Sequence, residues 1–341
     1  MKKLFLFFTL SMMLFLVYGS SPVMAQDIDP VEEEKLKSTK TAETKDGWHF
    51  RFKPSSNFNL ADNRKVVGQP EGYSMTFGLN LDLGITLFKG KHEWRNTFLI
   101  NEAITRTPVI DEFIISTDTF KIESMYLYYF YDWFGLYGRL AMDTSMFPSY
   151  DVQPAQSTYA ITGKDGTIDF LLDDKVKLTG PFAPFTLKEG FGPFFRPLAK
   201  EEINLEFLLG LGFWQTWQNG ELTVSDDGDT AEIEVKTLQN VYQIGGESIN
   251  RMWGELWTKR IAYLLAAELM MPFYVDPDVD PTGADRLNVF LNARLDLRFT
   301  EWMSIGYELK AIREPMTIEE WQLQNNLLIT LSYSLYEHLP Y

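Results

Sequence analysis

Histidine, serine and carboxylate side chains are the groups of this sequence that could carry catalysis or bind a metal. The histidines are His49, His92 and His338, and the sequence contains no GxSxG, HExxH or Walker-type motif around them or elsewhere. A serine–histidine pair requires the hydroxyl and the imidazole within hydrogen-bond reach. A hydrolase stays an open alternative, but we expect no enzymatic activity and no cofactor.

The second chemical candidate is the acidic segment DPDVDPTGAD, residues 276 to 285. Calcium prefers several carboxylate ligands gathered in one loop. The segment does not match the helix-loop-helix calcium motif, because Pro281 stands where that motif has glycine. We expect a solvated turn with no metal. The weak metal-ligand candidates are Asp276, Asp278, Asp280 and Asp285.

Long strands with one apolar and one polar face are the elements that must position these groups. In residues 73 to 88, YSMTFGLNLDLGITLF, an apolar side chain fills every second position from Tyr73 to Leu87. Strict alternation of this length predicts a β-strand. It exceeds the five or six residues that are usual in soluble sheets, whereas a membrane-spanning strand needs roughly 9 to 11. The other clear runs are 203–213, 287–299, 303–311 and 321–335.

The connections between the expected strands alternate between short and long. Weaker strand candidates lie at 48–54, 92–105, 119–130, 134–145, 181–195, 247–257 and 261–275. Short turns are expected at 88–91, 131–133, 196–200, 258–260 and 300–301. Long loops are expected at 55–71, 106–118, 146–180, 218–246, 276–284 and 314–320. Residues 229–244 could form one or two more strands, but we interpret them as the extension of an external hairpin.

Alternating short and long connections are typical of bacterial outer-membrane barrels, which have an even number of strands, short periplasmic turns and long external loops. The sequence therefore predicts an all-β fold, a closed antiparallel transmembrane β-barrel of about 12 strands, with 10 to 14 as the range. Both termini and all three histidines would then lie at the periplasmic end. Tryptophans beside short turns (Trp94, Trp133, Trp257, Trp302) and beside long loops (Trp214, Trp217, Trp321) fit two aromatic girdles.

The N-terminal region differs in composition from the rest. Residues 1–25 begin with two lysines before a short apolar run and end in small residues, which predicts a signal peptide cut after Ala25, with a membrane anchor as the alternative. Residues 26–47 carry seven acids and four lysines and no aromatic residue, so we expect a flexible acidic periplasmic segment. The barrel would occupy residues 48–341.

Charge and cysteine content exclude several classes of protein. The formal net charge is −16, which argues against a nucleic-acid partner because phosphate binding needs a basic face. The chain has no cysteine, so disulfides, thiolate metal sites and a lipid-modified N-terminal cysteine are excluded.

Charged residues inside the apolar strands indicate which face would line the lumen. A lysine or arginine that faces lipid at mid-depth costs roughly 2 to 4 kcal/mol, so these side chains are expected to point inward. Charges of both signs could simply pair with one another in a narrow barrel, or they could line a selective path for a polar solute. The predicted lumen-lining residues are Asp82, Arg139, Glu206, Arg294, Asp296, Arg298, Glu308 and Lys310.

Several stretches resemble an uncharacterised family of bacterial outer-membrane β-barrel proteins that is distantly similar to the salt-induced outer-membrane protein group. The stretches are HEWRNTFLINEA (92–103), the aromatic hairpin at 125–151, GPFAPFTLKEGFGPFFRP (180–197) and the closing hairpin at 286–335. The resemblance implies a fold and a location in the outer membrane. It implies no activity.

These observations lead to a functional expectation with an open alternative. We expect a narrow porin-like channel for small polar solutes in the bacterial outer membrane. The alternatives are a non-conducting structural or surface-interaction barrel and a soluble periplasmic lipid-binding sandwich. The expected partners are outer-membrane lipid, lipopolysaccharide and the barrel-assembly machinery, and the barrel is expected to be a monomer.

Overall fold

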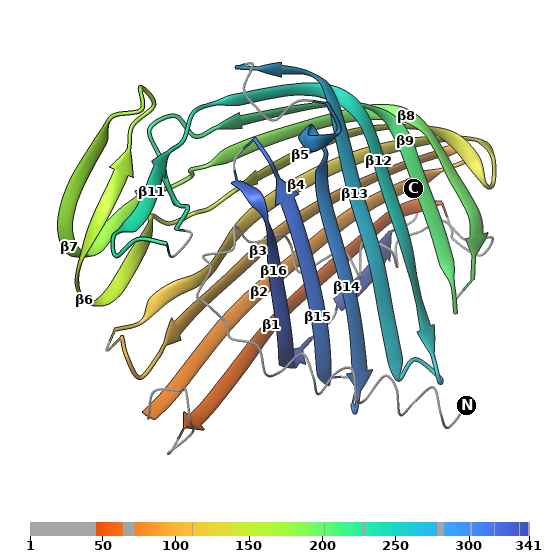
Figure 1. The fold of residues 1–341 in the computed structure, drawn as a ribbon. Helices are drawn as coiled ribbons and strands as arrows, with labels where there is room; N and C mark the ends of the chain where they lie inside the picture. Colours follow the sequence, from red (N-terminus) through yellow and green to blue (C-terminus); the bar gives the residue numbers. More distant parts are fainter. Residues whose placement is uncertain are drawn as a thin grey trace, which may run out of the picture.

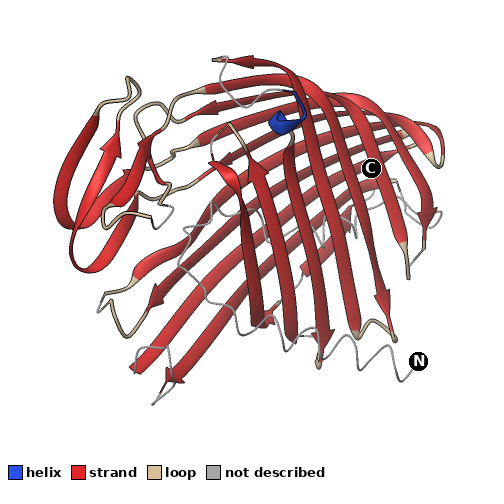
Figure 2. Ribbon diagram, in the orientation of Figure 1, coloured by secondary structure: helices blue, strands red, loops and turns tan. Residues whose placement is uncertain are grey.

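A computed structural model of the 341-residue chain describes residues 46–63, 72–110, 112–200, 202–226, 229–277, 283–300, 302–316, 318–333 and 335–339. This part of the chain consists of β-strands, their connections and the short 3₁₀ helix η3 (Gly283–Arg286) (Figure 2). None of the helices in these ranges has the length and apolar character needed to cross a membrane.

Twelve strand positions form one closed antiparallel barrel (Figure 1). The barrel strands are β1 (Gly47–Asn63), β2 (Gly72–Lys89), β3 (His92–Arg106), β4 (Ile114–Tyr131), β5 (Phe134–Thr144), β8 (Phe185–Ala199), β9 (Asn204–Trp217), β12 (Val241–Leu256), β13 (Ile261–Asp276), β14 (Asn288–Arg298), β15 (Met303–Glu314), β16 (Ile318–Ser332) and β17 (Leu335–Leu339). Strands that are consecutive in sequence are neighbours in the barrel. The exceptions are the neighbours β5 and β8 and the neighbours β9 and β12, between which the chain forms strands of a second sheet.

The last strand position closes the barrel against the first. β16 and β17 occupy this position in succession, and both pair antiparallel with β1. Trp48 lies opposite Leu339 and Ser55 lies opposite Ser332. The closure leaves neither β1 nor the last position as an open sheet edge, which is how a barrel satisfies its backbone hydrogen bonds.

The prediction of a closed antiparallel barrel of about 12 strands is confirmed. Several connections differ from the prediction. β1 continues to Asn63 and pairs with β2 along its whole length, so the expected loop at 55–71 is shorter. The expected long loop at 314–320 is a tight turn between Glu314 and Ile318, which lie opposite each other across β15 and β16.

A second, four-stranded sheet lies outside the barrel, and we call it the external sheet (left in Figure 1). Its strands are β6 (Ser149–Thr162), β7 (Ile168–Thr179), β10 (Leu222–Val224) and β11 (Ile233–Thr237). They come from the segments 146–180 and 218–246. The expectation of a plain loop at 146–180 was wrong, whereas the expected extension of an external hairpin at 229–244 contains β11, which pairs antiparallel with β10. β11 pairs parallel with β6, although the two strands are distant in sequence. Tyr159, Val176, Leu178 and Val235 form its small core.

The external sheet escaped sequence analysis because its strands do not alternate cleanly. β7 begins with the contiguous run IDFLL, whose side chains are exposed, and only its C-terminal half contributes to the core. β6 contains a register irregularity between Val152 and Ser157 and so breaks its own period. Strand periodicity can be read only where one face is consistently buried.

The outward face of the barrel is largely apolar. On β2, Phe77, Leu79 and Ile85 are exposed, and similar exposed leucine, isoleucine and aromatic side chains continue around the barrel. Trp94, Trp133, Trp257 and Trp302 are exposed beside the short turns. A continuous apolar belt with aromatic residues at its rim is typical of a protein surface in contact with lipid.

Candidate functional site

The barrel lumen is the candidate functional site, and strand alternation decides which side chains enter it. On β9, Glu206, Leu208 and Trp214 are buried, whereas Leu209 and Leu211 between them are exposed. Because successive side chains point to opposite faces of a strand, the buried set faces the lumen and the exposed set faces outward.

The first group of lumen residues lies toward the short-turn end, and we call it the arginine layer. It consists of Glu93, Arg95, Tyr129, Arg196, Glu206 and Arg251. The carboxylate of Glu206 is within 3.2 Å of Arg95 and 3.4 Å of Arg251, and it accepts a hydrogen bond from Arg196. These contacts cross the lumen, because β3 and β9 are separated by three strand positions.

Glu93 is the second carboxylate of the arginine layer. It pairs with Arg95, lies 3.7 Å from Arg196 and accepts a 2.5 Å hydrogen bond from the hydroxyl of Tyr129. The layer thus contains three arginines and two glutamates, a formal excess of one positive charge, and the side chains of both glutamates are fully shielded from solvent.

An apolar layer follows toward the long-loop end. Met125, Leu127, Tyr137, Phe194, Leu208 and Ile249 are buried in one cluster with Tyr129. The order along the strands confirms this sequence of layers: Leu208 follows Glu206 on β9, and Ile249 precedes Arg251 on the antiparallel β12. The side chains of this layer are almost fully shielded from solvent.

A second charged group lies beyond the apolar layer, and we call it the acidic layer. It consists of Glu123, Arg139, Lys188, Glu247 and Glu268. The guanidinium of Arg139 is 3.0 Å from Glu123, 2.8 Å from Glu268 and 3.6 Å from Glu247. Three carboxylates face two cations, so the formal excess is one negative charge, the reverse of the arginine layer.

Lys188 joins the acidic layer to two aromatic rings. Its ammonium nitrogen is 4.1 Å from the ring centroid of Trp214, 4.3 Å from that of Phe290 and 3.8 Å from the carboxylate of Glu268. Trp214 is 2% exposed and donates a 3.2 Å hydrogen bond from Nε1 to Glu247. The expectation that Trp214 belongs to an interfacial girdle was wrong. Its even position on β9 directs the ring into the lumen.

The structure distributes the predicted lumen-lining residues over five places. Arg139 and Glu206 are the central residues of the acidic and arginine layers. Asp82 on β2 pairs with Arg51 at 2.6 Å, and Arg298 near the short-turn rim pairs with Glu255 at 2.6 Å. The remaining four residues lie together on β14 and β15, where Arg294 contacts Asp296 at 2.7 Å and Lys310 lies 3.7 Å from Glu308.

The wall formed by β1 and β2 differs from the rest of the lumen. Lys53, Ser55 and Asn57 on β1 and Asn80 and Asp82 on β2 occupy the inward positions and remain partly exposed. The inward positions of β3, by contrast, are buried from Glu93 to Ala103. The lumen is therefore filled with side chains on the β3 side and keeps a partly solvated polar strip along the middle and long-loop part of β1 and β2, whereas Arg51, Thr86 and Phe88 toward the short turns are buried.

Most members of the two charged layers were missed by sequence analysis. Glu93, Arg95, Arg196, Glu247 and Arg251 lie in strands whose polar and apolar residues mix, because their inward faces carry both kinds of side chain. The available signal was whether a residue has an odd or an even number, because alternate residues of a strand face the same side. Each of these residues lies at an odd or even position together with the other buried residues of its strand. Parity becomes informative only once the strand bounds are known.

The histidine and aspartate candidates are not gathered into a site in the described ranges. His49 and His92 lie at the short-turn end, where the Nδ1 of exposed His92 is 2.5 Å from the hydroxyl of Tyr126, and His338 lies opposite His49 across β1 and β17. Asp276 and Asp285 are exposed, and Asp278 and Asp280 lie outside the described residues. Within those residues, no three histidine or acidic side chains are placed to hold a metal. The predicted signal peptide at 1–25 and residues 26–45 of the predicted acidic segment 26–47 also lie outside them.

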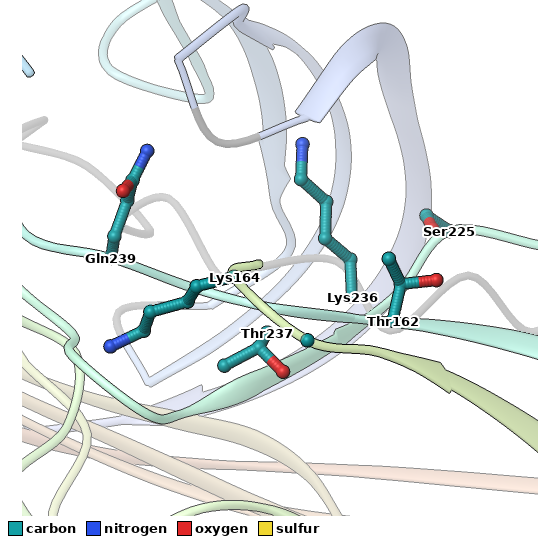
Figure 3. Close-up of a pocket in the computed structure, with 7 residues that line it drawn as sticks. Thr162, Lys164, Ser225, Lys236, Thr237 and Gln239 are labelled. Atoms are coloured by element: carbon teal, nitrogen blue, oxygen red, sulfur yellow. The ribbon is translucent and has the colours of Figure 1, made fainter. Parts of the chain in front are cut away.

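A pocket of about 210 Å³ lies on the external sheet (Figure 3). Thr162, Lys164, Ser225, Lys236 and Thr237 are among its lining residues. The ammonium groups of Lys164 and Lys236 point apart in Figure 3, and that of Lys164 donates a hydrogen bond to Asn219. The lysines therefore do not converge on a common anion site.

No family model matches the chain, and no curated protein matches it. The resemblance to the salt-induced group thus stays a prediction. Among solved structures, the chain is similar to an outer-membrane channel from Pseudomonas putida F1, with a TM-score of 0.40, 10% identity, and coverage of 91% of this chain and 100% of that one.

Two other solved barrels are similar at the same level. The translocator domain of the autotransporter NalP from Neisseria meningitidis has a TM-score of 0.39 and 10% identity, covering 88% of this chain and 93% of that one. A mutant of the monoaromatic hydrocarbon channel TodX has a TM-score of 0.36 and 9% identity, covering 90% and 94%. Structural similarity at this level does not indicate a function for this chain.

Proposed function

We propose that the protein is a monomeric β-barrel of the bacterial outer membrane, with its short turns and both termini in the periplasm. The proposal is supported by the closed sheet, the apolar outward face and the tryptophans at the short-turn rim. In this orientation the external sheet lies on the outer side, beside lipopolysaccharide. The barrel-assembly machinery would insert the chain, as it does for barrels of this kind.

Within this barrel, we propose a narrow channel for small polar solutes. The observation that carries the proposal is the partly exposed polar strip on β1 and β2, which includes Lys53, Asn57 and Asp82. Filled layers occupy the β3 side, so the path is restricted to one wall. A path of this kind favours low conductance and selection by the charges along the strip.

The test is conductance in a planar bilayer with purified, folded protein. We expect small discrete current steps, and we expect Asp82→Asn to shift the ion selectivity toward anions because it removes a negative charge from the strip. Asp165→Asn, which changes an exposed turn of the external sheet, is the matched control and should leave selectivity unchanged. A quiet bilayer at high dose of a protein that migrates as a folded barrel on unheated gels would reject the channel.

The second candidate is a non-conducting surface-interaction barrel. It is favoured by the external sheet, whose β7 exposes Ile168, Phe170 and Leu172 at the long-loop end. Apolar side chains exposed on a strand at a sheet edge are typical of a contact surface. Deleting residues 149–179 should then abolish a surface interaction without changing conductance, whereas the channel proposal requires only the barrel.

A further inference from the structure

The surroundings of Lys188 are those of a bound cation. Its ammonium group lies over the rings of Trp214 and Phe290, at 4.1 and 4.3 Å from their centroids, and 3.8 Å from the carboxylate of Glu268. The two rings are 5.6 Å apart and inclined at 54°, so they form two walls of a corner rather than a stack. Aromatic faces attract cations through their negative quadrupole, most strongly where water is excluded.

The acidic layer adds negative charge on the open sides of this corner. Glu247 accepts the indole hydrogen bond of Trp214, which fixes the ring, and Glu268 faces the ammonium directly. Glu314 also interacts electrostatically with Lys188 and Glu268. Arg139 is shared between Glu123, Glu247 and Glu268, and Lys121 also interacts electrostatically with Glu268.

We propose that this corner, which we call the aromatic corner, is a binding site for a small organic cation and that the Lys188 ammonium occupies it when no solute is present. The site lies on the long-loop side of the apolar layer, so a solute would reach it from the outer mouth. The proposal rests on the proposed channel function for its physiological meaning, because it names alkylammonium compounds as the solute class.

The chemistry of the walls selects the class of ligand. A metal ion needs several oxygen ligands to replace its hydration shell, and two of the walls are rings that supply none. An alkylammonium group can be surrounded by ring faces and a carboxylate, and methylated ammonium groups in particular are recognised by aromatic cages. Lys188 can leave the site because its charge is carried on a flexible four-carbon stem.

The alternative explanation is that Lys188 is only a paired core residue, and calorimetry can separate the two. Detergent-solubilised protein is titrated with propylammonium chloride and tetramethylammonium chloride, with sodium chloride at equal ionic strength as the reference. Lys188→Ala empties the aromatic corner, so we expect it to bind the organic cations at least tenfold more tightly than the natural chain. The reference salt should give no site-specific heat in either.

Two further variants make the test decisive. Lys310→Ala removes another buried lumen lysine, which pairs with Glu308 at 3.7 Å, and should not gain this affinity. Phe290→Leu added to Lys188→Ala should remove most of the gain, since it takes away one ring. Equal binding by the Lys188 and Lys310 variants, or no loss on adding Phe290→Leu, would overturn the site.

Folding and channel function are checked separately from binding. Lys188→Ala is tested only if it folds, which is shown by a change in gel mobility on heating. If it does not fold, the natural chain is compared with the single variant Phe290→Leu. Phe290→Leu is then expected to bind the organic cations at least fivefold more weakly than the natural chain. Binding in detergent does not require conduction, so a quiet bilayer would reject only the channel. A conducting barrel without alkylammonium binding would reject only this inference.

Discussion

Replacing Glu206 with glutamine should destabilise the barrel more than any other single loss of charge in the lumen. Its carboxylate is fully buried and contacts Arg95, Arg196 and Arg251 from three different strands. Glutamine has nearly the same volume, so no cavity forms and the effect is electrostatic. The formal excess of the arginine layer rises from one positive charge to two.

The magnitude follows from the cost of a buried charge that loses its partner. Breaking a buried ion pair by removing one member typically costs about 3 to 5 kcal/mol. Glu93 still holds Arg95 and Arg196, so we expect the lower part of this range. The assay is urea unfolding in detergent micelles, followed by tryptophan fluorescence and by mobility on unheated gels.

Glu308→Gln is the matched control for this prediction. Glu308 is almost as inaccessible, but its contacts with Lys310 at 3.7 Å and Asn292 at 3.4 Å are longer than those of Glu206 with Arg95 and Arg196, and Asn292 still reaches the new amide oxygen. We expect a loss of about 1.5 kcal/mol, the lower end for a hydrogen bond or contact to a charged group. If Glu206→Gln costs no more than this control, the arginine layer is not held by Glu206 and the reasoning fails.

Three other perturbations test the barrel wall and the external sheet. Leu79→Arg places a charge in the middle of the outward face of β2 and should cost roughly 2 to 4 kcal/mol in lipid-refolding equilibria, whereas Tyr73→Arg at the rim should cost less than about 1 kcal/mol. Gly135→Ala should cost about 1 to 3 kcal/mol in urea unfolding because its Cβ would overlap a backbone carbonyl of β4, while Gly138→Ala on the same strand meets nothing and should be neutral. Tyr159→Phe removes a 2.7 Å hydrogen bond to a carboxylate on the same strand and should speed proteolysis within 149–179 without changing barrel unfolding.

The barrel could be predicted from the sequence because every barrel strand must separate lipid from the lumen. The outward positions of β2 and β14 are apolar without exception near mid-strand, and this regular constraint produces the period that sequence analysis detects. Strands with weak periods, such as β8 with its prolines, were found only through the alternation of the connections. Their inward residues include Phe194 and Lys188 together, so no simple polar face marks them.

The layers of the lumen could not be predicted from the same information. Arg95 and Glu206 are 111 residues apart, and Arg139 and Glu268 are 129 apart. Which inward residues meet depends on the relative shift of strands on opposite sides of the barrel, and periodicity within a strand does not contain that shift. The external sheet depends in the same way on the parallel pairing of β11 with β6.

The pairing of β17 with β1 has a consequence for how the molecule is made. The segment Trp48–Phe52 finds its partner in Leu335–Leu339, so the contact that seals the wall joins opposite ends of the chain. Contacts of such large sequence separation form late, because the whole intervening polypeptide must be brought into place first. A copy lacking Leu335–Leu339 would leave the backbone groups of Trp48–Phe52 unpaired on that side, because β16 pairs only with Ser55–Asn57 farther along β1. Such an open edge can associate with other chains, so the copy would depend on a chaperone.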